Sequence, residues 1–169
     1  MIRIFYACEA NTNGIGFKNS IPWKCSLDMQ MYMKVLQESD ISVCGPKTWE
    51  NLPPKAKRLN TPAVISNRAN SKQYPLLLNV INTDCNVLIS GGSSIYKFCI
   101  DHSIADEIII NRIAFKNKKY SKLDFDTFGL SNEEISLNYS LKSVNQFEDD
   151  SCTIFQEIYI RKYKTKICS

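Results

Sequence analysis

The stretch VLISGGSSIY, residues 87–96, joins a short apolar run to a pair of glycines and a helix-compatible segment. Its first four residues predict a buried strand, and a helix is expected from the residues after the glycines to about His102. Glycine lets the backbone approach a ligand closely, and the free N–H groups at a helix start favour phosphate. Taken alone, the turn is better explained by an ordinary connection in which Ser93 or Ser94 caps the helix. Its spacing also differs from the G-x-G-x-x-G pattern of the common dinucleotide-binding turn.

A second turn of the same kind follows another apolar run, Ile41–Cys44. The residues GPKTW, 45–49, lead from this predicted strand into a short helix expected over Lys47–Leu52. Lys47 and Thr48 are candidate ligands for phosphate oxygens, although a capped surface helix is the simpler explanation for this turn alone. Two such turns at the ends of parallel strands lie where open α/β sheets bind ligands, so together they favour a dinucleotide site.

Short apolar runs alternate with helical patterns along the chain. This predicts one α/β domain over residues 1–169, with a central, mostly parallel sheet and helices on both faces. Two strand-like segments flank the turn EDDS, residues 148–151, and predict a C-terminal antiparallel hairpin. Glu9–Trp23 and Asn117–Thr127 have loop compositions, and the first of these is expected to be mobile. The other expected elements are a helix over Ser26–Leu36 and strands over Ile2–Cys8, Ala63–Ser66, Glu107–Phe115, Tyr139–Gln146 and Thr153–Tyr163.

Composition narrows the class of protein. A formal net charge of +4 and 44% hydrophobic residues in 169 are typical of a globular protein of one domain. The basic residues are scattered, so nucleic acid is not an expected partner, and no apolar stretch reaches the roughly 20 residues of a membrane span. The seven cysteines form no C-x-x-C pair and there is one histidine. We therefore expect free thiols, a cytoplasmic location and no metal site.

One acidic residue is of interest because of its neighbours. Asp28 lies in the first turn of the predicted helix, shortly after Pro22-Trp23. A first-turn carboxylate is commonly explained by the helix dipole alone. The alternative is a carboxylate that faces a cleft and holds an amino-heterocycle through two parallel hydrogen bonds. Burial would raise its pKa and the helix start would lower it, so the residues alone leave both interpretations open.

Four stretches, taken in order, resemble the dihydrofolate reductase family over nearly the whole chain. Gly14–Trp23 followed by Asp28 is similar to the family's active-site loop and catalytic acid. Residues 45–50 and 89–96 are similar to its two cofactor turns, and Asp126-Thr127-Phe128 is similar to its late acidic loop motif. The order and the spacing of these stretches match the family as well.

The resemblance implies a monomeric enzyme with an eight-stranded, mostly parallel sheet that reduces 7,8-dihydrofolate to 5,6,7,8-tetrahydrofolate with NADPH. Hydride would pass from the nicotinamide to the pterin ring, with Asp28 as the pterin-binding acid and Trp23 holding a water near it. A phosphate-facing Arg68 would favour NADPH over NADH. The implied substrate-binding residues are Tyr6, Ala7, Met29, Tyr32, Leu52, Asn60, Ser90 and Asn111. The implied cofactor-binding residues are Ala7, Ile15, Gly16, Asn19, Ser20, Gly45, Lys47, Thr48, Ser66, Asn67, Arg68, Gly91, Gly92, Ser93, Ser94, Ile95 and Tyr96.

Two departures from the family pattern concern the substrate. Asn60 stands where the family usually has an Arg that binds the glutamate carboxylate of folate. Lys57 or Arg58 takes that place if the loop is realigned. Asn111 stands where a Thr normally assists the acid, and its amide can still donate a hydrogen bond, although its shape differs.

Two further departures concern the cofactor and the loops. Pro46 replaces a common basic residue, which removes one phosphate contact, and residues 68–86 are short for the family while residues 117–126 are long. Two alternative functions share these features: a related reductase of another pterin or of a riboflavin-pathway pyrimidine, and a non-catalytic dinucleotide-binding protein. Asp28 after Pro22-Trp23 favours the folate enzyme, whereas Asn60 favours the related reductase.

Overall fold

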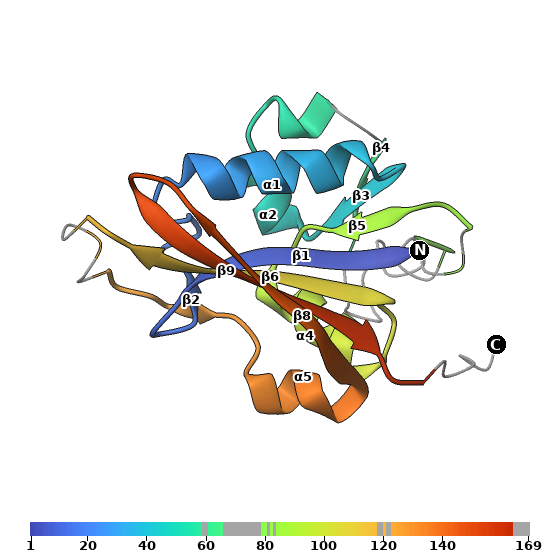
Figure 1. Cartoon of the computed structure of the whole chain (residues 1–169). Helices are drawn as coiled ribbons and strands as arrows, with labels where there is room; N and C mark the ends of the chain where they lie inside the picture. The colour runs from blue at the N-terminus through green and yellow to red at the C-terminus, as the bar shows by residue number, and fades with distance from the viewer. Residues whose placement is uncertain are drawn as a thin grey trace.

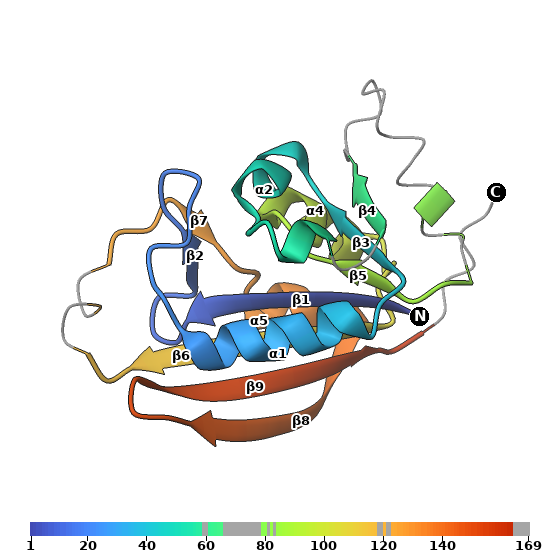
Figure 2. The same ribbon diagram turned by 90° about the horizontal axis from the view of Figure 1, so that it is seen from above.

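A seven-stranded sheet runs through the middle of the molecule (Figures 1 and 2), and its strands lie in the order β4-β3-β5-β1-β6-β9-β8. The computed structural model describes residues 1–58, 61–65, 79–80, 82, 84–117, 120 and 123–163. The pairings from β4 through to β6 are parallel, and β9 and β8 add two antiparallel pairings at one edge. The strands are β1 (Ile2–Glu9), β3 (Ile41–Cys44), β4 (Thr61–Val64), β5 (Val87–Ile89), β6 (Glu107–Phe115), β8 (Tyr139–Glu148) and β9 (Cys152–Arg161).

The central strand β1 shows why the core has two halves. Successive side chains of a strand point to opposite faces of the sheet, so a strand covered on both faces is apolar throughout. Ile4 and Tyr6 pack into the cluster on the α4 side, and Phe5 packs against Leu36 on the other side. Figure 1 shows α1 (Ser26–Gln37) over one face and α4 (Ser93–Asp101) with α5 (Asn132–Asn138) over the other.

Local signals explain where the shorter helices begin. α2 (Pro46–Asn51) follows Gly45 and has a proline in its first turn, where the missing N–H costs nothing. The next turn is a 3-10 helix, Ala56–Arg58. In α5 the Ser131 hydroxyl accepts the backbone N–H of Glu134, and the Glu134 carboxylate accepts the backbone N–H of Ser131. No helix of the described ranges is long and apolar enough to cross a membrane.

The predicted fold class, including the C-terminal antiparallel hairpin, is confirmed, but three details differ. The described residues form a seven-stranded sheet, not the eight-stranded one that the resemblance implies. The expected loop Glu9–Trp23 contains the strand β2 (Gly14–Gly16), which pairs with β7 (Thr127–Phe128) in a separate two-stranded sheet. The helix α5 was not predicted; it has seven residues and one buried residue, although its capping box is visible in the sequence.

Candidate active site

The carboxyl ends of the parallel strands lie together along one edge of the sheet, the edge that crosses the strands, and α1 begins there (Figures 1 and 2). Ala7, near the end of β1, is the register partner of Asn111 in β6. The two glycine turns follow β3 and β5, which are neighbours in the sheet. The topology therefore collects the predicted acid and the predicted cofactor turns at one edge, as open α/β sheets do at their ligand sites.

Asp28 occupies the first turn of α1 and is partly buried. The Sγ atom of Cys25 accepts its backbone N–H at 3.5 Å, and its own Oδ1 accepts a hydrogen bond from Asn111 Nδ2 at 2.8 Å. Burial raises the pKa of Asp28 from 3.8 to about 6, and the bond from Asn111 opposes that increase. The carboxyl can therefore exchange a proton close to neutral pH, which suits a general acid.

Asn111 is a polar residue on an apolar face. It is 0% exposed, and it lies between Ile109 and Ile113 on the face of β6 that α1 covers. Its Nδ2 also donates to Met31 Sδ at 3.4 Å, and its Oδ1 accepts from Gln156 Nε2 at 3.0 Å. Gln156 Nε2 lies 3.8 Å from the same sulfur. The buried amide is thus fully hydrogen-bonded, as a polar group in an apolar surrounding must be.

Trp23 is buried in an aromatic cluster close to the start of α1. Its ring centroid lies 5.8 Å from that of Phe115 and 6.0 Å from that of Phe125. Ala7 and Cys25 belong to the same cluster. This cluster also includes Met31, whose sulfur contacts the Asn111 amide.

A row of three hydroxyl groups joins α1 to β3 and to the residue that follows β5. Tyr32 Oη, on α1, donates to Ser90 Oγ at 3.2 Å, and Ser42 Oγ lies 3.4 Å from Ser90 Oγ. Met29, on the outer side of α1, is 40% exposed and borders a cavity of about 440 Å³. The cavity is lined by Met29, Gln30, Met33, Lys34, Gln37, Pro53, Lys55 and Ala56.

The two glycine turns are joined directly, because the Gly45 N–H donates to the Gly91 carbonyl at 2.7 Å. Gly91 has a φ of +121°, and a Cβ there would lie 3.0 Å from Tyr96 Oη. A Cβ on Gly92 would lie 3.2 Å from Thr48 Oγ1. The positive φ therefore requires glycine at position 91, Gly92 fits tightly against Thr48, and the backbone of one turn is held against the other.

The start of α4 differs from the expected one. Gly92, not Ser93 or Ser94, is the N-cap residue, and no side chain provides a cap bond. The helix begins directly after the glycine, so both serines lie within its first turn. Tyr96 is buried next to the turn. Its hydroxyl donates to the Phe5 carbonyl at 3.2 Å, and its ring stacks on the Tyr6 ring with 5.0 Å between centroids. Ile95 packs beside Gly45.

The loop before Trp23 is attached to the β7 segment. Its tip is a tight hairpin over residues 17–20, in which Lys18 and Asn19 have positive φ angles of 49° and 63°. Asp126 Oδ2 accepts the Lys18 N–H at 2.8 Å, and the Asp126 N–H donates to the Gly16 carbonyl at 3.1 Å. The late acidic motif and the loop therefore form one unit, although they are distant in sequence.

The remaining predicted site residues are not drawn into these contacts. Ile15 packs against the core, and Ser20 is exposed in the hairpin. Lys47 is exposed in the first turn of α2, and Leu52 is half-buried at the end of that helix. Asn60, Ser66, Asn67 and Arg68 lie outside the described residues.

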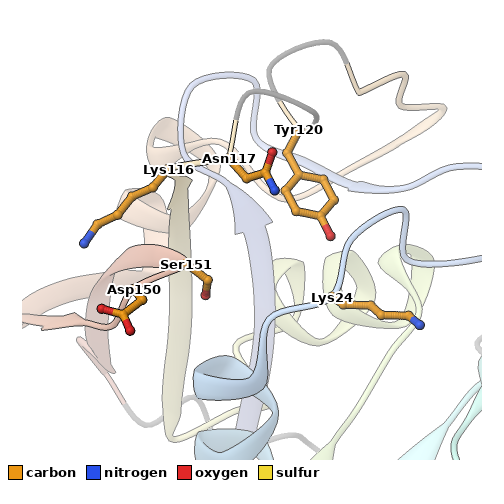
Figure 3. A pocket seen from close by; sticks show the side chains of 6 residues that line it. All are labelled: Lys24, Lys116, Asn117, Tyr120, Asp150 and Ser151. Atoms are coloured by element: carbon orange, nitrogen blue, oxygen red, sulfur yellow. The ribbon is translucent and has the colours of Figure 1, made fainter.

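Another hollow, of about 480 Å³, lies beside the turn that precedes β9 (Figure 3). Figure 3 shows that Lys24 and Lys116 extend in opposite directions from it. Lys116 Nζ forms an ion pair with Glu148 and donates to the Asp149 carbonyl at 2.7 Å. The charged groups do not converge on a common point, so we do not assign the hollow a ligand. Its lining residues are Lys24, Lys116, Asn117, Tyr120, Asp150 and Ser151.

Several residues around the acid are not predicted by the sequence motifs. Gln156 is the polar member of an alternating apolar row on residues 152–160 of β9, and this pattern was a usable signal. Nothing in the sequence indicates that Met31 accepts two N–H groups, or that the Cys25 and Cys152 sulfurs lie 3.1 Å apart. The described residues contain no group of three or more His, Cys, Asp or Glu placed to hold a metal ion.

A mostly parallel sheet with joined glycine turns and a partly buried carboxyl at one edge is typical of α/β enzymes that hold a ligand across the strand ends. The chain belongs to the dihydrofolate reductase family, because a sequence profile described as dihydrofolate reductase matches residues 1–152. It is therefore an oxidoreductase of a family that reduces dihydrofolate.

Relatives described as dihydrofolate reductase are similar at low identity. The Candida albicans protein is 25% identical, over 75% of this chain and 74% of its own length. The protein of Mycoplasma pneumoniae (strain ATCC 29342 / M129 / Subtype 1) is 26% identical, over 79% of this chain and 90% of its own length. The protein of Saccharomyces cerevisiae (strain ATCC 204508 / S288c) is 26% identical, over 63% and 62% respectively. These values make the chain a divergent member of the family.

Proposed function

We propose that this enzyme uses NADPH to reduce 7,8-dihydrofolate to 5,6,7,8-tetrahydrofolate, with Asp28 as the acid that binds the pterin. The observation that carries the proposal is the position of Asp28. Its carboxyl, with a pKa raised to about 6, lies at the sheet edge that also carries the joined glycine turns. An acid and a nucleotide site at one edge are what a reductase of a protonatable ring requires.

The glycine turns fit a dinucleotide. A Cβ on Gly91 or Gly92 would press closely on Tyr96 or Thr48, and α4 starts at Gly92 without a side-chain cap. Such a start favours the phosphates of a nucleotide, and we assign them to this turn and to the start of α2. When bound, NADPH supplies the hydride. Arg68, Ser66 and Asn67 are the residues that we assign to its 2′-phosphate side, as the resemblance implies.

Asp28 performs the acid–base part of the reaction. Its carboxyl oxygens accept hydrogen bonds from the ring N–H and the amino group of the pterin, which fixes the ring in one orientation. This interaction favours the tautomer that takes up a proton at N5, next to the carbon that receives hydride. To Trp23, which packs on Phe115 and Phe125, we assign the role of holding a water near the acid, as the resemblance implies.

The cavity beside Met29 is the place that we assign to the benzoyl-glutamate tail of the substrate. Met33 and Pro53 supply apolar contact for a ring, and Lys34 and Lys55 supply ammonium groups for the tail carboxylates. Lys57 is less suited, because its ammonium donates to the Glu50 carbonyl at 3.2 Å and lies over the Trp49 ring. We propose that Lys34 and Lys55 bind the tail carboxylates in place of the Arg that is absent at position 60.

The test is the fall in absorbance of reduced nicotinamide when purified protein is mixed with NADPH and dihydrofolate. A substrate-dependent fall at an enzymatic rate supports the proposal, and the same assay with NADH measures the cofactor preference. If NADPH binds but no fall occurs, the proposed substrate is wrong and pterins without a glutamate tail are tried next. We also expect a monomer of one domain that works in the cytoplasm, which ultracentrifugation and cell fractionation would test.

A further inference from the structure

We propose that Gln156 is a positioning residue for the acid: by donating to Asn111, it holds the Asn111 amide with its N–H groups toward Asp28. The proposal rests on the role of Asp28 in the proposed function. The hydrogen bonds of Gln156 go to Asn111 and Met31 and not to Asp28, so Gln156 acts on the acid through Asn111. The chain of bonds crosses three elements, from β9 through β6 to α1.

The orientation of Asn111 matters because its two ends have opposite character. The Nδ2 group only donates and Oδ1 only accepts. As placed, Nδ2 lies 2.8 Å from Asp28 Oδ1, and Oδ1 lies 3.0 Å from Gln156 Nε2. A half-turn of the amide would bring its oxygen against the carboxylate, so two acceptors would meet. Asn111 is 0% exposed, and no bulk water would relieve this contact.

Met31 strengthens the same orientation. Its thioether sulfur only accepts, and it lies 3.4 Å from Asn111 Nδ2 and 3.8 Å from Gln156 Nε2. Turning both amides together would keep the bond between them but would direct both oxygens at the sulfur. The donor direction of the whole chain, from Gln156 to Asn111 to Asp28, is therefore the one in which every acceptor meets a donor.

This arrangement acts on the protonation of Asp28. A Thr hydroxyl at position 111 would rotate, donating to an ionised acid or accepting from a protonated one. The amide that Gln156 and Met31 hold in place can only donate, so it favours the ionised carboxylate. Asn111 thus works against burial, and the strength of its effect depends on Gln156.

The other titratable groups around the acid do not provide this effect. Tyr32 and Tyr96 face the site from α1 and α4, and burial raises the pKa of both, so they stay neutral near pH 7. Arg112 and Glu157 follow directly on β6 and β9, point to the opposite face and pair with each other at 2.8 Å. The thiols beside the first turn of α1 are those of Cys25 and Cys152, and their sulfurs lie 3.1 Å from each other.

The pKa of Asp28, followed by 13C NMR of its labelled carboxyl in the ligand-free protein, tests the proposal. Gln156→Leu should raise this pKa by on the order of one unit, as expected for weakening one charge-assisted hydrogen bond. Gln146→Leu is the matched control, because Gln146 is exposed on the neighbouring strand β8, and it should leave the titration unchanged. If Gln156→Leu fails to fold, Gln156→Met keeps the length of the side chain and removes the N–H donor.

A double-mutant cycle separates a positioning role of Gln156 from a general change in the surroundings of Asp28. In an Asn111→Ala background, Gln156→Leu should not move the pKa of Asp28, because the intermediate side chain is gone. An equal shift in both backgrounds, or no shift in the original one, overturns the proposal.

The titration needs neither substrate nor NADPH, so it does not depend on the outcome of the absorbance assay. If the enzyme is active, the midpoint of its pH–rate profile should move up with the pKa in Gln156→Leu. A shifted titration without dihydrofolate reduction leaves the positioning role intact and removes the proposed substrate. Dihydrofolate reduction with an unshifted titration supports the proposed substrate and overturns the positioning role.

Discussion

The carboxyl of Asp28 experiences two opposed influences, since burial favours its neutral form and the Asn111 N–H favours its charged form. Burial is the larger, and the resulting pKa of about 6 lies above the ordinary 3.8. A charge that is costly to bury is kept where chemistry needs it, which is a common reason why active sites reduce stability. The motif identified Asp28 in the sequence. Gln156 was not identified, because its role depends on pairing between strands that the motif does not include.

We predict that Asp28→Asn removes most turnover near neutral pH, by about 100-fold or more, with partial recovery in acid where solvent supplies the proton. NADPH binding should be nearly unchanged. Stopped-flow hydride transfer and a fluorescence titration of NADPH measure the two effects. An unchanged rate would contradict the assigned role of Asp28.

The same variant should be more stable than the original protein at pH 7. The raised pKa corresponds to roughly 3 kcal/mol of stability that is present below pH 3.8 and is lost as pH rises through about 6. Asp28→Asn removes this loss, so calorimetry should show its advantage at pH 7 and none near pH 3.5. The exposed Asp124→Asn serves as control and should show no such pH-dependent gain.

We predict that Lys34→Ala and Lys55→Ala each raise the KM for dihydrofolate by roughly two- to fivefold, which is the usual scale of an exposed ion pair. A pterin without the glutamate tail should be affected much less. Steady-state kinetics with both substrates give the comparison, and Lys142→Ala on β8 is the exposed control. Equal effects on the two substrates would place the tail elsewhere.

At the scale of elements, the prediction was good wherever hydrophobic pattern and helix signals agree. Glu107–Phe115 was predicted with the bounds that the structure shows, because a strand covered on both faces carries apolar residues on both, here Ile108-Ile109-Ile110 and Ile113. β2 and β7 have two or three residues each, and their pairing with each other joins segments more than a hundred residues apart. Such short strands have no periodicity to detect, so the loop that they form was visible only in its composition.

Asp126 gives this paired loop a testable attachment point. We predict that Asp126→Ala increases hydrogen exchange of the Lys18 amide several-fold, because that N–H loses its acceptor at 2.8 Å. The bond from Lys18 is the main reason that the pKa of Asp126 is lowered, so the attachment should persist at neutral pH and weaken only in strong acid. Asp124→Ala, in the same segment, should leave this amide unchanged. Equal exchange in both variants would mean that the hairpin is held by other contacts.

Over the whole molecule, the sheet order brings together segments that lie far apart in sequence. The acid comes from α1, its amide partners come from β6 and β9, and the glycine turns follow β3 and β5. The resemblance anticipated the acid and the turns because each is a local motif. The chain of amides and the contact between the turns depend on strand register, which single residues do not reveal.

Because the proposed cofactor site spans several elements, binding should stabilise the entire fold. We predict that NADPH at about one hundred times its Kd adds about 2.7 kcal/mol and raises Tm by roughly 5–10 °C. Differential scanning calorimetry measures the shift. Asp28→Asn should show the same increase, since Asp28 lies on the substrate side. No increase in either protein would argue against a nucleotide site at the glycine turns.

The hydroxyl row of Tyr32, Ser90 and Ser42 has a consequence for inhibitor design. A hydroxyl proton can rotate, so a compound that displaces one of these bonds would find either a donor or an acceptor. A keto analogue and an amino analogue would both find a partner, and the hydroxyl row would discriminate poorly between them. The carboxyl of Asp28 is held by the fixed N–H of Asn111, so selective drugs for this enzyme are best built toward Asp28.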